Sequence, residues 1–191
     1  MKKYELTEET VTVYGKTLYR IRAVRDFGSV KTREFGGYIE KEENLSHFGN
    51  AWISGDARVS GDARVYGNAW VYGNARVSGD ARVYGNAWVY GNARVSGDAR
   101  VSGNAWVYGN AEVFNTRHFF VQGPIGSRDG YVTFYRTKDD TVEVRCGCFS
   151  GSLQEFVNQV EETHGGSRYE KEYKLAAELA KVCIRLEGES R

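Results

Sequence analysis

The most regular feature of the chain is a six-residue alternation of small, apolar and polar positions from Gly49 to Phe114. Eleven consecutive units read Gly-(Asn/Asp)-Ala-(Trp/Arg/Glu)-(Val/Ile)-(Tyr/Ser/Phe), without insertion or deletion. Ala and Val or Ile stand two positions apart, so they point to the same side of a short strand. The Gly-Asn and Gly-Asp pairs suit corners, because Gly adopts a positive φ at little cost. The repeat therefore predicts stacked coils with an Ala and Val interior.

A second period of 18 residues lies on top of the first, because Trp recurs at every third unit. If three units make one turn, the indoles form a column on one face, and the spacing predicts a three-sided parallel β-helix of about four coils. This first face carries Trp52, Trp70, Trp88 and Trp106, with Tyr72, Tyr90 and Tyr108 beside them. The second face carries Arg58, Arg76, Arg94 and Glu112, and the third carries Arg64, Arg82 and Arg100.

The flanking segments have other patterns. Residues 10–14 and 17–24 alternate across Gly15-Lys16, which predicts a hairpin, and residues 36–40 are expected to begin a first, irregular coil. A coiled repeat must cover its terminal apolar cross-section. We therefore expect residues 1–48 to form an N-terminal β cap on a β-helix of residues 49–114.

Residues 115–191 predict a small C-terminal α+β module. Strands are expected over residues 117–122, 131–137 and 141–146. Ser152 followed by Glu155 is a capping box that begins one helix. A second helix is indicated by an apolar stripe of Tyr169, Tyr173, Ala177, Ala180 and Ile184. The whole chain is thus expected to be mainly β.

Composition narrows the functional classes. The chain has 26 Lys and Arg against 25 Asp and Glu, so no basic excess favours duplex nucleic acid or a membrane surface. The start resembles no signal peptide, and no apolar run approaches the roughly 20 residues of a membrane span. The 3 Cys form no disulfide framework and fit a reducing compartment. We expect a cytoplasmic protein.

The six-residue unit resembles that of the hexapeptide-repeat proteins over residues 49–114. That resemblance implies a left-handed parallel β-helix and assembly as a homotrimer. One departure is that Tyr or Ser follows the aliphatic position, where family units commonly have Gly. Residues 18–23, 36–40 and 44–46, together with the Gly-Asn-Ala repeats, are also similar to proteins frequent in bacteriophages and prophages. This second resemblance implies a phage-encoded protein in the host cytoplasm.

The aromatic face needs a cover, because four Trp and three Tyr left in water would expose several hundred Å². A homotrimer interface is the leading interpretation. A planar ligand and cover by the terminal modules are the alternatives, and pairing of two trimers stays open. The predicted interface residues are Trp52, Trp70, Trp88, Trp106, Tyr72, Tyr90 and Tyr108.

Two features suggest anion binding. Arg76 and Arg94 follow Asn rather than Asp and would stack about 4.8 Å apart, so an acidic residue of another subunit or a bound anion is needed between them. For residues 123–130 a plain wide hairpin connection is the leading interpretation, and the alternative is that its glycines let backbone N–H groups converge on an anion. The predicted ligand-binding residues are Arg76, Arg94, Arg117, His118, Gly126, Ser127 and Arg128.

Catalysis is the weaker interpretation. The resemblance points to acyltransferases that use a His between subunits as general base, but the regular coils contain no His and no inserted loop. His47 and His118, at the two ends of the coils, are the alternative catalytic residues. Cys146, Cys148, Cys183 and His164 give poor metal-ligand spacing, so neither a metal nor a cofactor is expected.

The leading hypothesis is a non-catalytic homotrimeric β-helix protein that binds small anionic ligands at clefts between subunits. Arg beside aromatic side chains is the composition that grips nucleotides. In a phage, such a protein would act as a sponge for a nucleotide signal of host defence, which is an inference by analogy. The alternatives are an acyltransferase and a structural or protein-binding scaffold.

Overall fold

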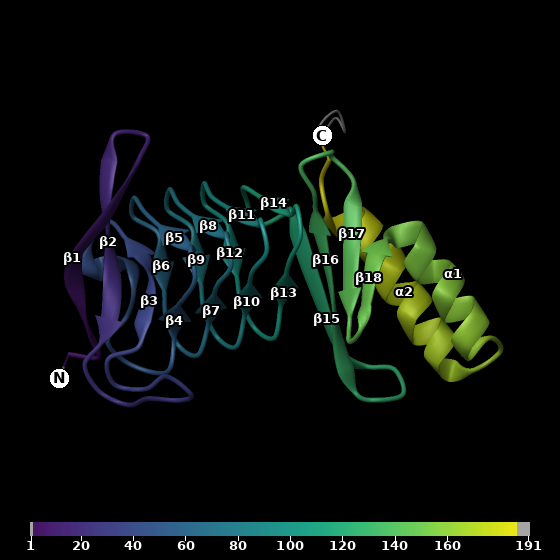
Figure 1. Ribbon diagram of the computed structural model, residues 1–191. Coiled ribbons are helices and arrows are strands. Elements are labelled where there is room, and N and C mark those ends of the chain that lie inside the picture. Colours follow the sequence, from purple (N-terminus) through teal and green to yellow (C-terminus); the bar gives the residue numbers. More distant parts are fainter. Residues whose placement is uncertain (1, 187–191) are drawn as a thin grey trace.

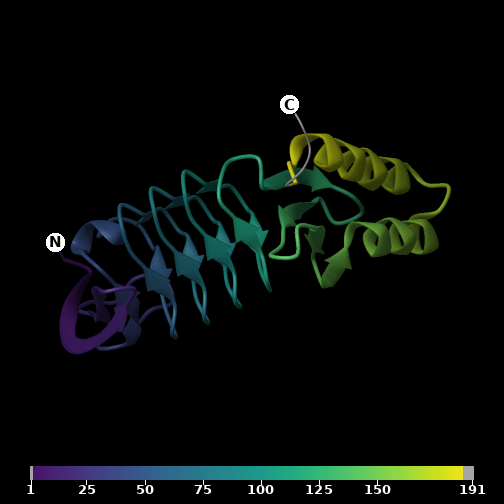
Figure 2. The same cartoon turned by 90° about the horizontal axis from the view of Figure 1, so that it is seen from above.

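The computed structural model describes residues 2–186 of the chain. The fold is mainly β. A β-solenoid of about four turns lies between an N-terminal β region and a C-terminal sheet with two helices, at opposite ends of the molecule (Figures 1 and 2). Met1 and residues 187–191, which the sequence analysis assigned to the terminal modules, lie outside the described residues.

The solenoid has three faces built from two-residue strands. The first face comprises β4 (Trp52–Ile53), β7 (Trp70–Val71), β10 (Trp88–Val89) and β13 (Trp106–Val107). The second comprises β5 (Arg58–Val59), β8 (Arg76–Val77), β11 (Arg94–Val95) and β14 (Glu112–Val113). The third comprises β6 (Arg64–Val65), β9 (Arg82–Val83) and β12 (Arg100–Val101). Trp70 pairs in parallel with both Trp52 and Trp88, which confirms the 18-residue coil. That the coil is left-handed stays a prediction, which comes from the resemblance to the hexapeptide-repeat proteins.

The interior is filled by the two apolar positions of each unit. Every Ala and every Val or Ile at these positions, from Ala51 to Val113, has 0% exposure. Backbone hydrogen bonds join each coil to the next, as where Trp70 N donates to Ala87 O at 2.9 Å. At one corner the Asn side chains also bond from coil to coil, including Asn86 Nδ2 to Asn104 Oδ1 at 3.0 Å. The solenoid thus satisfies its backbone groups through neighbouring coils.

The corner glycines are required for two reasons. All eleven have φ between +58° and +73°, a region that side chains rarely adopt. Most also lie close to the next coil. A Cβ on Gly79 would stand 2.9 Å from Gly97 N, a backbone atom that cannot move aside.

The strands of the N-terminal cap continue the sheet of the second face. β1 (Tyr4–Val13) and β2 (Lys16–Ala23) form the expected hairpin, although β1 begins earlier than residue 10. β3 (Phe35–Ile39) pairs antiparallel with β2 and parallel with β5, so it is the first rung of the solenoid. A short 3₁₀ helix, Glu42–Asn44, leads into the third face.

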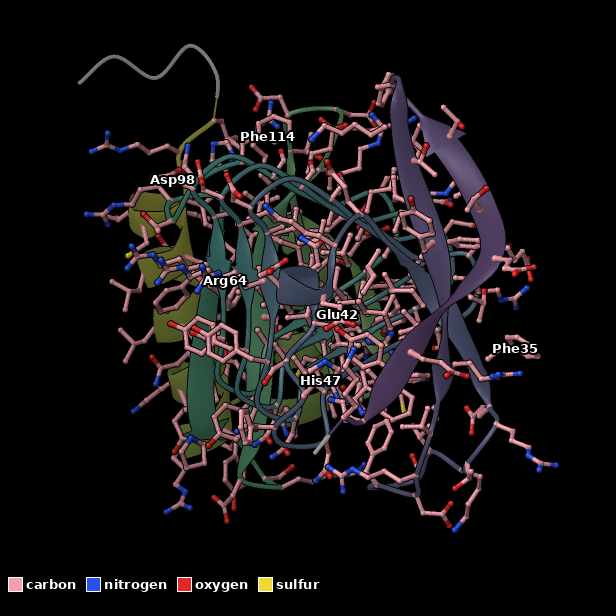
Figure 3. All side chains as sticks on the ribbon, turned by 90° about the vertical axis from the view of Figure 1, so that its left-hand side faces the viewer. Phe35, Glu42, His47, Arg64, Asp98 and Phe114 are labelled. Atoms are coloured by element: carbon pink, nitrogen blue, oxygen red, sulfur yellow. The ribbon has the colours of Figure 1, made fainter. Side chains whose placement is uncertain are left out.

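The cap buries the first indole. Trp52 has 0% exposure and packs edge-on against Phe27 at 5.3 Å and Tyr4 at 6.4 Å between ring centroids. Lys3, also at 0% exposure, donates from Nζ to Ala51 O at 2.7 Å. Figure 3 looks onto this end, where His47 and Glu42 lie near each other and Phe35 points outward. For this indole the N-terminal cap supplies the cover, which is one of the alternatives that the sequence leaves open.

The C-terminal module is a four-stranded antiparallel sheet covered by two helices. Its elements are β15 (Phe119–Ile125), β16 (Gly130–Arg136), β17 (Val142–Cys146), β18 (Phe149–Ser152), α1 (Leu153–His164) and α2 (Arg168–Cys183). The capping box of Ser152 and Glu155 is confirmed. β18 was not predicted, and β15 extends through residues 123–125, which were expected to be loop.

The double role of the corner glycines predicts a graded loss of stability. Gly79→Ala is expected to cost about 1–2 kcal/mol for the left-handed backbone and about 1–3 kcal/mol more for the clash with the next coil. Gly103 has φ +70° but open space around a Cβ, so Gly103→Ala should show only the first cost. Equal losses in urea unfolding would contradict the packing argument.

Buried Lys3 predicts a pH dependence. Burial and the nearby charge of Arg25 lower the pKa of Lys3 to about 8. Because the unfolded chain binds this proton up to its ordinary pKa, the folded state gains stability as pH rises through this window. Between about pH 7.5 and about pH 9.5, wild type should gain unfolding free energy relative to Lys3→Met. Exposed Lys2 provides the control, since Lys2→Met should keep the wild-type slope.

Candidate functional site

The exposed part of the tryptophan column is a stack of near-parallel rings. Ring centroids lie 6.2 Å apart for Trp70 and Trp88 and 5.8 Å apart for Trp88 and Trp106, with interplanar angles of 25° and 24°. Trp88 remains 37% exposed and Trp106 36% exposed. Tyr72 and Tyr90 stack beside them at 4.8 Å. Trp70, Trp88 and Trp106 therefore form the predicted aromatic face beyond the capped first coil.

The C-terminal module meets this column at its last indole. Thr133 on β16 accepts a hydrogen bond at Oγ1 from the backbone N–H of Trp106 at 3.0 Å. Arg145 on β17 places its guanidinium carbon 5.7 Å from the Trp106 ring centroid and 5.7 Å from that of Tyr108. The module thus holds a cation over the end of an aromatic stack, a favourable cation–π arrangement.

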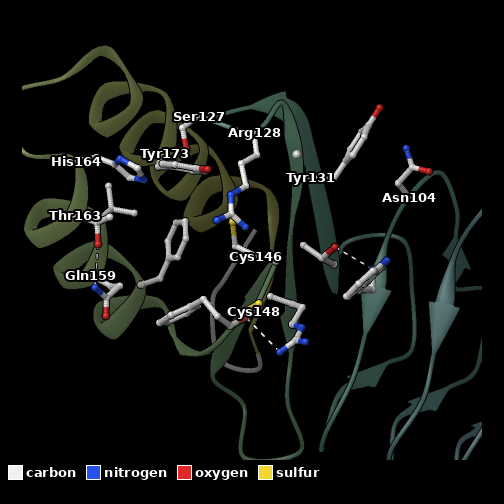
Figure 4. A pocket seen from close by; sticks show the side chains of 18 residues that line it. Asn104, Ser127, Arg128, Tyr131, Cys146, Cys148, Gln159, Thr163, His164 and Tyr173 are labelled. Carbon is white, nitrogen blue, oxygen red and sulfur yellow. Dashed lines mark hydrogen bonds between the residues drawn. The ribbon is translucent and has the colours of Figure 1, made fainter.

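A cavity of about 690 Å³ opens where the last coil, the sheet and the helices meet (Figure 4). Its volume falls within the range of small-molecule sites, roughly 300–1,000 Å³. Tyr131 and Asn104 lie on the solenoid side, and His164 and Tyr173 on the helix side. The remaining lining residues are Trp106, Ser127, Arg128, Gly130, Thr133, Arg145, Cys146, Gly147, Cys148, Phe149, Phe156, Gln159, Val160 and Thr163.

The charge of the cavity is one-sided. Arg128 and Arg145 line it, whereas none of its lining residues within 2–186 is acidic. Arg128 points into it from the turn between β15 and β16 (Figure 4). Nε of Arg145 is buried without a hydrogen-bond partner, and its Nη1 lies 3.5 Å from Phe149 O. Two arginines in a lining without acidic residues favour an anionic occupant.

The helix side of the cavity combines aromatic rings with polar side chains. Tyr173 packs edge-on against Phe156 at 5.8 Å and stacks with His164 at 5.6 Å. Burial raises the pKa of Tyr173 to about 12 and also raises the pKa of the Cys146 thiol. Both groups are therefore protonated at neutral pH, and Cys146 is not an activated nucleophile.

In the glycine-rich turn between β15 and β16, a backbone N–H binds a carboxylate of the same chain. The N–H of Gly126 donates to Glu172 Oε2 at 2.7 Å, and a Cβ here would lie 1.9 Å from Tyr173 Oη. Gly126 therefore anchors the turn to α2, and its N–H donates to this carboxylate, contrary to the expectation that it serves a bound anion. The anchored turn presents Ser127 and Arg128 to the cavity.

The other predicted ligand-binding residues lie elsewhere. Arg76 and Arg94 pair in register on the second face, where Arg94 lies 3.7 Å from Glu112. Arg117 is exposed beyond the last coil, and its carbonyl accepts from Arg185 N at 2.9 Å. None of these residues lines the cavity, so of the seven predicted residues the structure brings only Ser127 and Arg128 to it.

Both candidate catalytic histidines are held in local contacts. His118 is buried, and its Nδ1 accepts from Phe114 N at 3.1 Å. His47 stacks on Tyr4 at 4.4 Å, accepts at Nδ1 from Lys3 N at 3.2 Å, and places Nε2 3.6 Å from Glu42. Neither ring lines the cavity.

Within the described residues, no three His, Cys, Asp or Glu side chains gather as a metal site requires. Among residues 2–186, no helix is long and apolar enough to cross a membrane.

Sequence reasoning missed the meeting of Trp106, Arg145 and Tyr173. Arg145 stands in a predicted strand, but nothing near it in the sequence indicates that this strand packs on the last coil. The cavity exists only because the last coil, β17 and α2, which are distant in sequence, meet in space.

The family model of the YdcK Beta solenoid repeat matches the chain in seven overlapping segments within the solenoid. They are residues 51–67, 57–73, 63–78, 69–85, 75–91, 87–103 and 93–109. Together they span residues 51–109, about a third of the chain. No curated protein sequence matches the chain. The fold and this match define a β-helix repeat protein.

Proposed function

We propose that the chain is a non-catalytic, homotrimeric β-helix protein that binds a small anion with a flat ring, a nucleotide being the best fit. The cavity of about 690 Å³ supports this proposal most strongly, because two arginines and an indole line it and none of its described lining residues is acidic. In this proposal the cavity replaces the separate anion sites that the sequence suggested at Arg76 and Arg94 and at residues 123–130.

The ring would stack on Trp106. The indoles of the column already accept parallel neighbours about 6 Å away, and bases stack on aromatic side chains irrespective of sequence. Arg145, which now lies over Trp106, and Arg128 would pair with the phosphate. The net charge of +1 favours a small ligand over a polymer.

The trimer would form through the aromatic face. In a closed three-fold ring, one face of each subunit meets a different face of the next. The Arg column on the second face is complementary to indoles and phenols through cation–π contacts, and its last member, Arg94, lies 3.7 Å from Glu112. Trp106 belongs to both the aromatic face and the cavity wall. A neighbouring subunit would therefore border the ligand, which would lie at a cleft between subunits.

The resemblance to phage and prophage proteins supplies a biological setting for this proposal. A phage-encoded trimer that binds nucleotides without turnover would lower the free concentration of a host immune signal, and so act as a sponge in the host cytoplasm.

Calorimetric titration with linear and cyclic mononucleotides tests the ligand. Binding by wild type is expected, and Arg128→Ala should weaken it roughly 10- to 100-fold, since a charge-assisted hydrogen bond contributes about 1.5–3 kcal/mol. Arg128 is exposed, so this variant should fold. The matched control is Arg100→Ala, which removes an exposed Arg of the third face and should leave affinity unchanged.

Three results would contradict the ligand proposal: no heat from any nucleotide, equal binding by Arg128→Ala, or turnover of a bound ligand. Acetyl-CoA turnover that disappears in His47→Ala would favour the acyltransferase alternative. Capture of a host protein by the ligand-free chain would favour the scaffold alternative.

The aromatic face predicts the effect of a single charge on assembly. Trp88→Lys places a cation in the middle of the exposed column and should abolish three-fold association, as measured by sedimentation. Tyr14 is 90% exposed at the tip of the hairpin, so Tyr14→Lys should leave the subunit count unchanged. A wild type whose subunit count is not a multiple of three would contradict the trimer.

A further inference from the structure

A ladder of asparagine side chains follows one corner of the solenoid and ends at the cavity. Asn50, Asn68 and Asn86 each donate from Nδ2 to Oδ1 of the asparagine on the next coil, at 3.3, 3.2 and 3.0 Å. The ladder therefore has one direction, because each bonded oxygen faces the preceding coil and each bonded nitrogen faces the following one. Its last member, Asn104, lines the cavity, as Trp106 of the same coil does.

Asn104 ends the ladder with two donors that no further coil meets. Its Oδ1 accepts from Asn86, so its amide nitrogen is turned away from the earlier coils (Figure 4). In earlier coils the backbone N–H at this corner also donates onward, as from Asn86 N to Gly103 O at 2.8 Å. Within residues 2–186, neither Nδ2 nor the backbone N–H of Asn104 has an acceptor. The corner thus offers two donors where a further coil would supply two carbonyl oxygens.

Space is open at this end of the ladder. A Cβ on Gly85 would lie 3.0 Å from Gly103 N of the next coil, whereas a Cβ on Gly103 would meet no atom within 4 Å. Gly103 directly precedes Asn104. The strand that follows the last coil, β15, pairs with β16 and does not continue the solenoid. A ligand can therefore approach the two donors.

Two adjacent donors select the kind of ring that fits. One edge of guanine carries two acceptors, O6 and N7, whereas the same edge of adenine carries the N7 acceptor and the N6 donor. An asparagine with both amide atoms available suits adenine, because its oxygen accepts from N6. In Asn104 the oxygen is engaged by Asn86, so this corner offers donors. It is complementary to guanine and mismatched to adenine.

We propose that Asn104 determines the specificity of the cavity, which takes guanine nucleotides in preference to adenine nucleotides. This inference rests on the proposed function, because the base reaches the corner by stacking on Trp106. Nδ2 of Asn104 donates to O6, and its backbone N–H donates to N7. Arg128 and Arg145 remain available for the phosphate.

Calorimetric titration of the full chain with GMP, IMP and AMP tests this specificity. The three ligands carry the same ribose and phosphate, so the phosphate contacts cancel in a ratio of affinities. GMP should bind roughly 5- to 100-fold more tightly than AMP, the range expected of one good two-bond contact with a base edge. IMP has O6 and N7 but no 2-amino group, so it should bind like GMP.

Asn104→Asp should reverse the preference. The carboxylate keeps an acceptor for Asn86 and offers its second oxygen to the N6 amino group, while the backbone N–H still donates to N7. AMP should therefore bind more tightly than GMP, and the comparison cancels the effect of the added negative charge. Asn92→Asp is the matched control, because Asn92 accepts from Asn74 at 3.4 Å in another ladder and does not line the cavity. It should keep the wild-type ratio.

The outcomes separate this inference from the proposed function. Equal affinity for GMP and AMP, or a preference that Asn104→Asp leaves unchanged, would overturn the guanine specificity while the proposed function stands. If IMP bound as weakly as AMP, recognition would belong to the 2-amino group, and the roles given to O6 and N7 would be wrong. No binding of any of the three would contradict the proposed function, and this inference with it.

Discussion

The stacking of each coil on the next, in a register of 18 residues, is the constraint on which the rest of the structure depends. Corner glycines with positive φ turn the chain, and a backbone ladder ties Trp70 to Ala87 and each later coil to its successor. Ala and Val or Ile fill the interior, and the backbone bonds from each coil to the next hold the register. This register turns a repeat in the sequence into columns in space, with Trp and Tyr aligned on the first face and Arg aligned on the other two.

The two ends of the tryptophan column are covered to different extents. At the first coil the cap covers Trp52 completely with Tyr4 and Phe27. At the last coil the module covers Trp106 only in part, and Arg145 lies over the ring. Trp106 and Arg145 both line the cavity, so the cavity borders the last ring of the stack. An aromatic platform with cations beside it is suited to a flat anion.

Strictly periodic and local features were predictable from the sequence. The tryptophan column, the hairpin turn at Gly15-Lys16 and the Ser152 helix cap all depend on neighbours within one coil or one turn. The burial of Trp52 was not predictable, because it depends on β1 beginning at Tyr4 and reaching across the first coil. The bond from Gly126 to Glu172 was missed for a related reason. A glycine-rich turn shows that N–H groups are available, but not which carboxylate of a distant helix accepts from them.

A crystal structure of the protein with a bound mononucleotide tests the central claim most directly. The account predicts the base parallel to the Trp106 indole, as the next ring of the column, with the phosphate within hydrogen-bond distance of Arg128 and Arg145. A nucleotide bound on another face of the solenoid, with Arg145 still over Trp106, would contradict it.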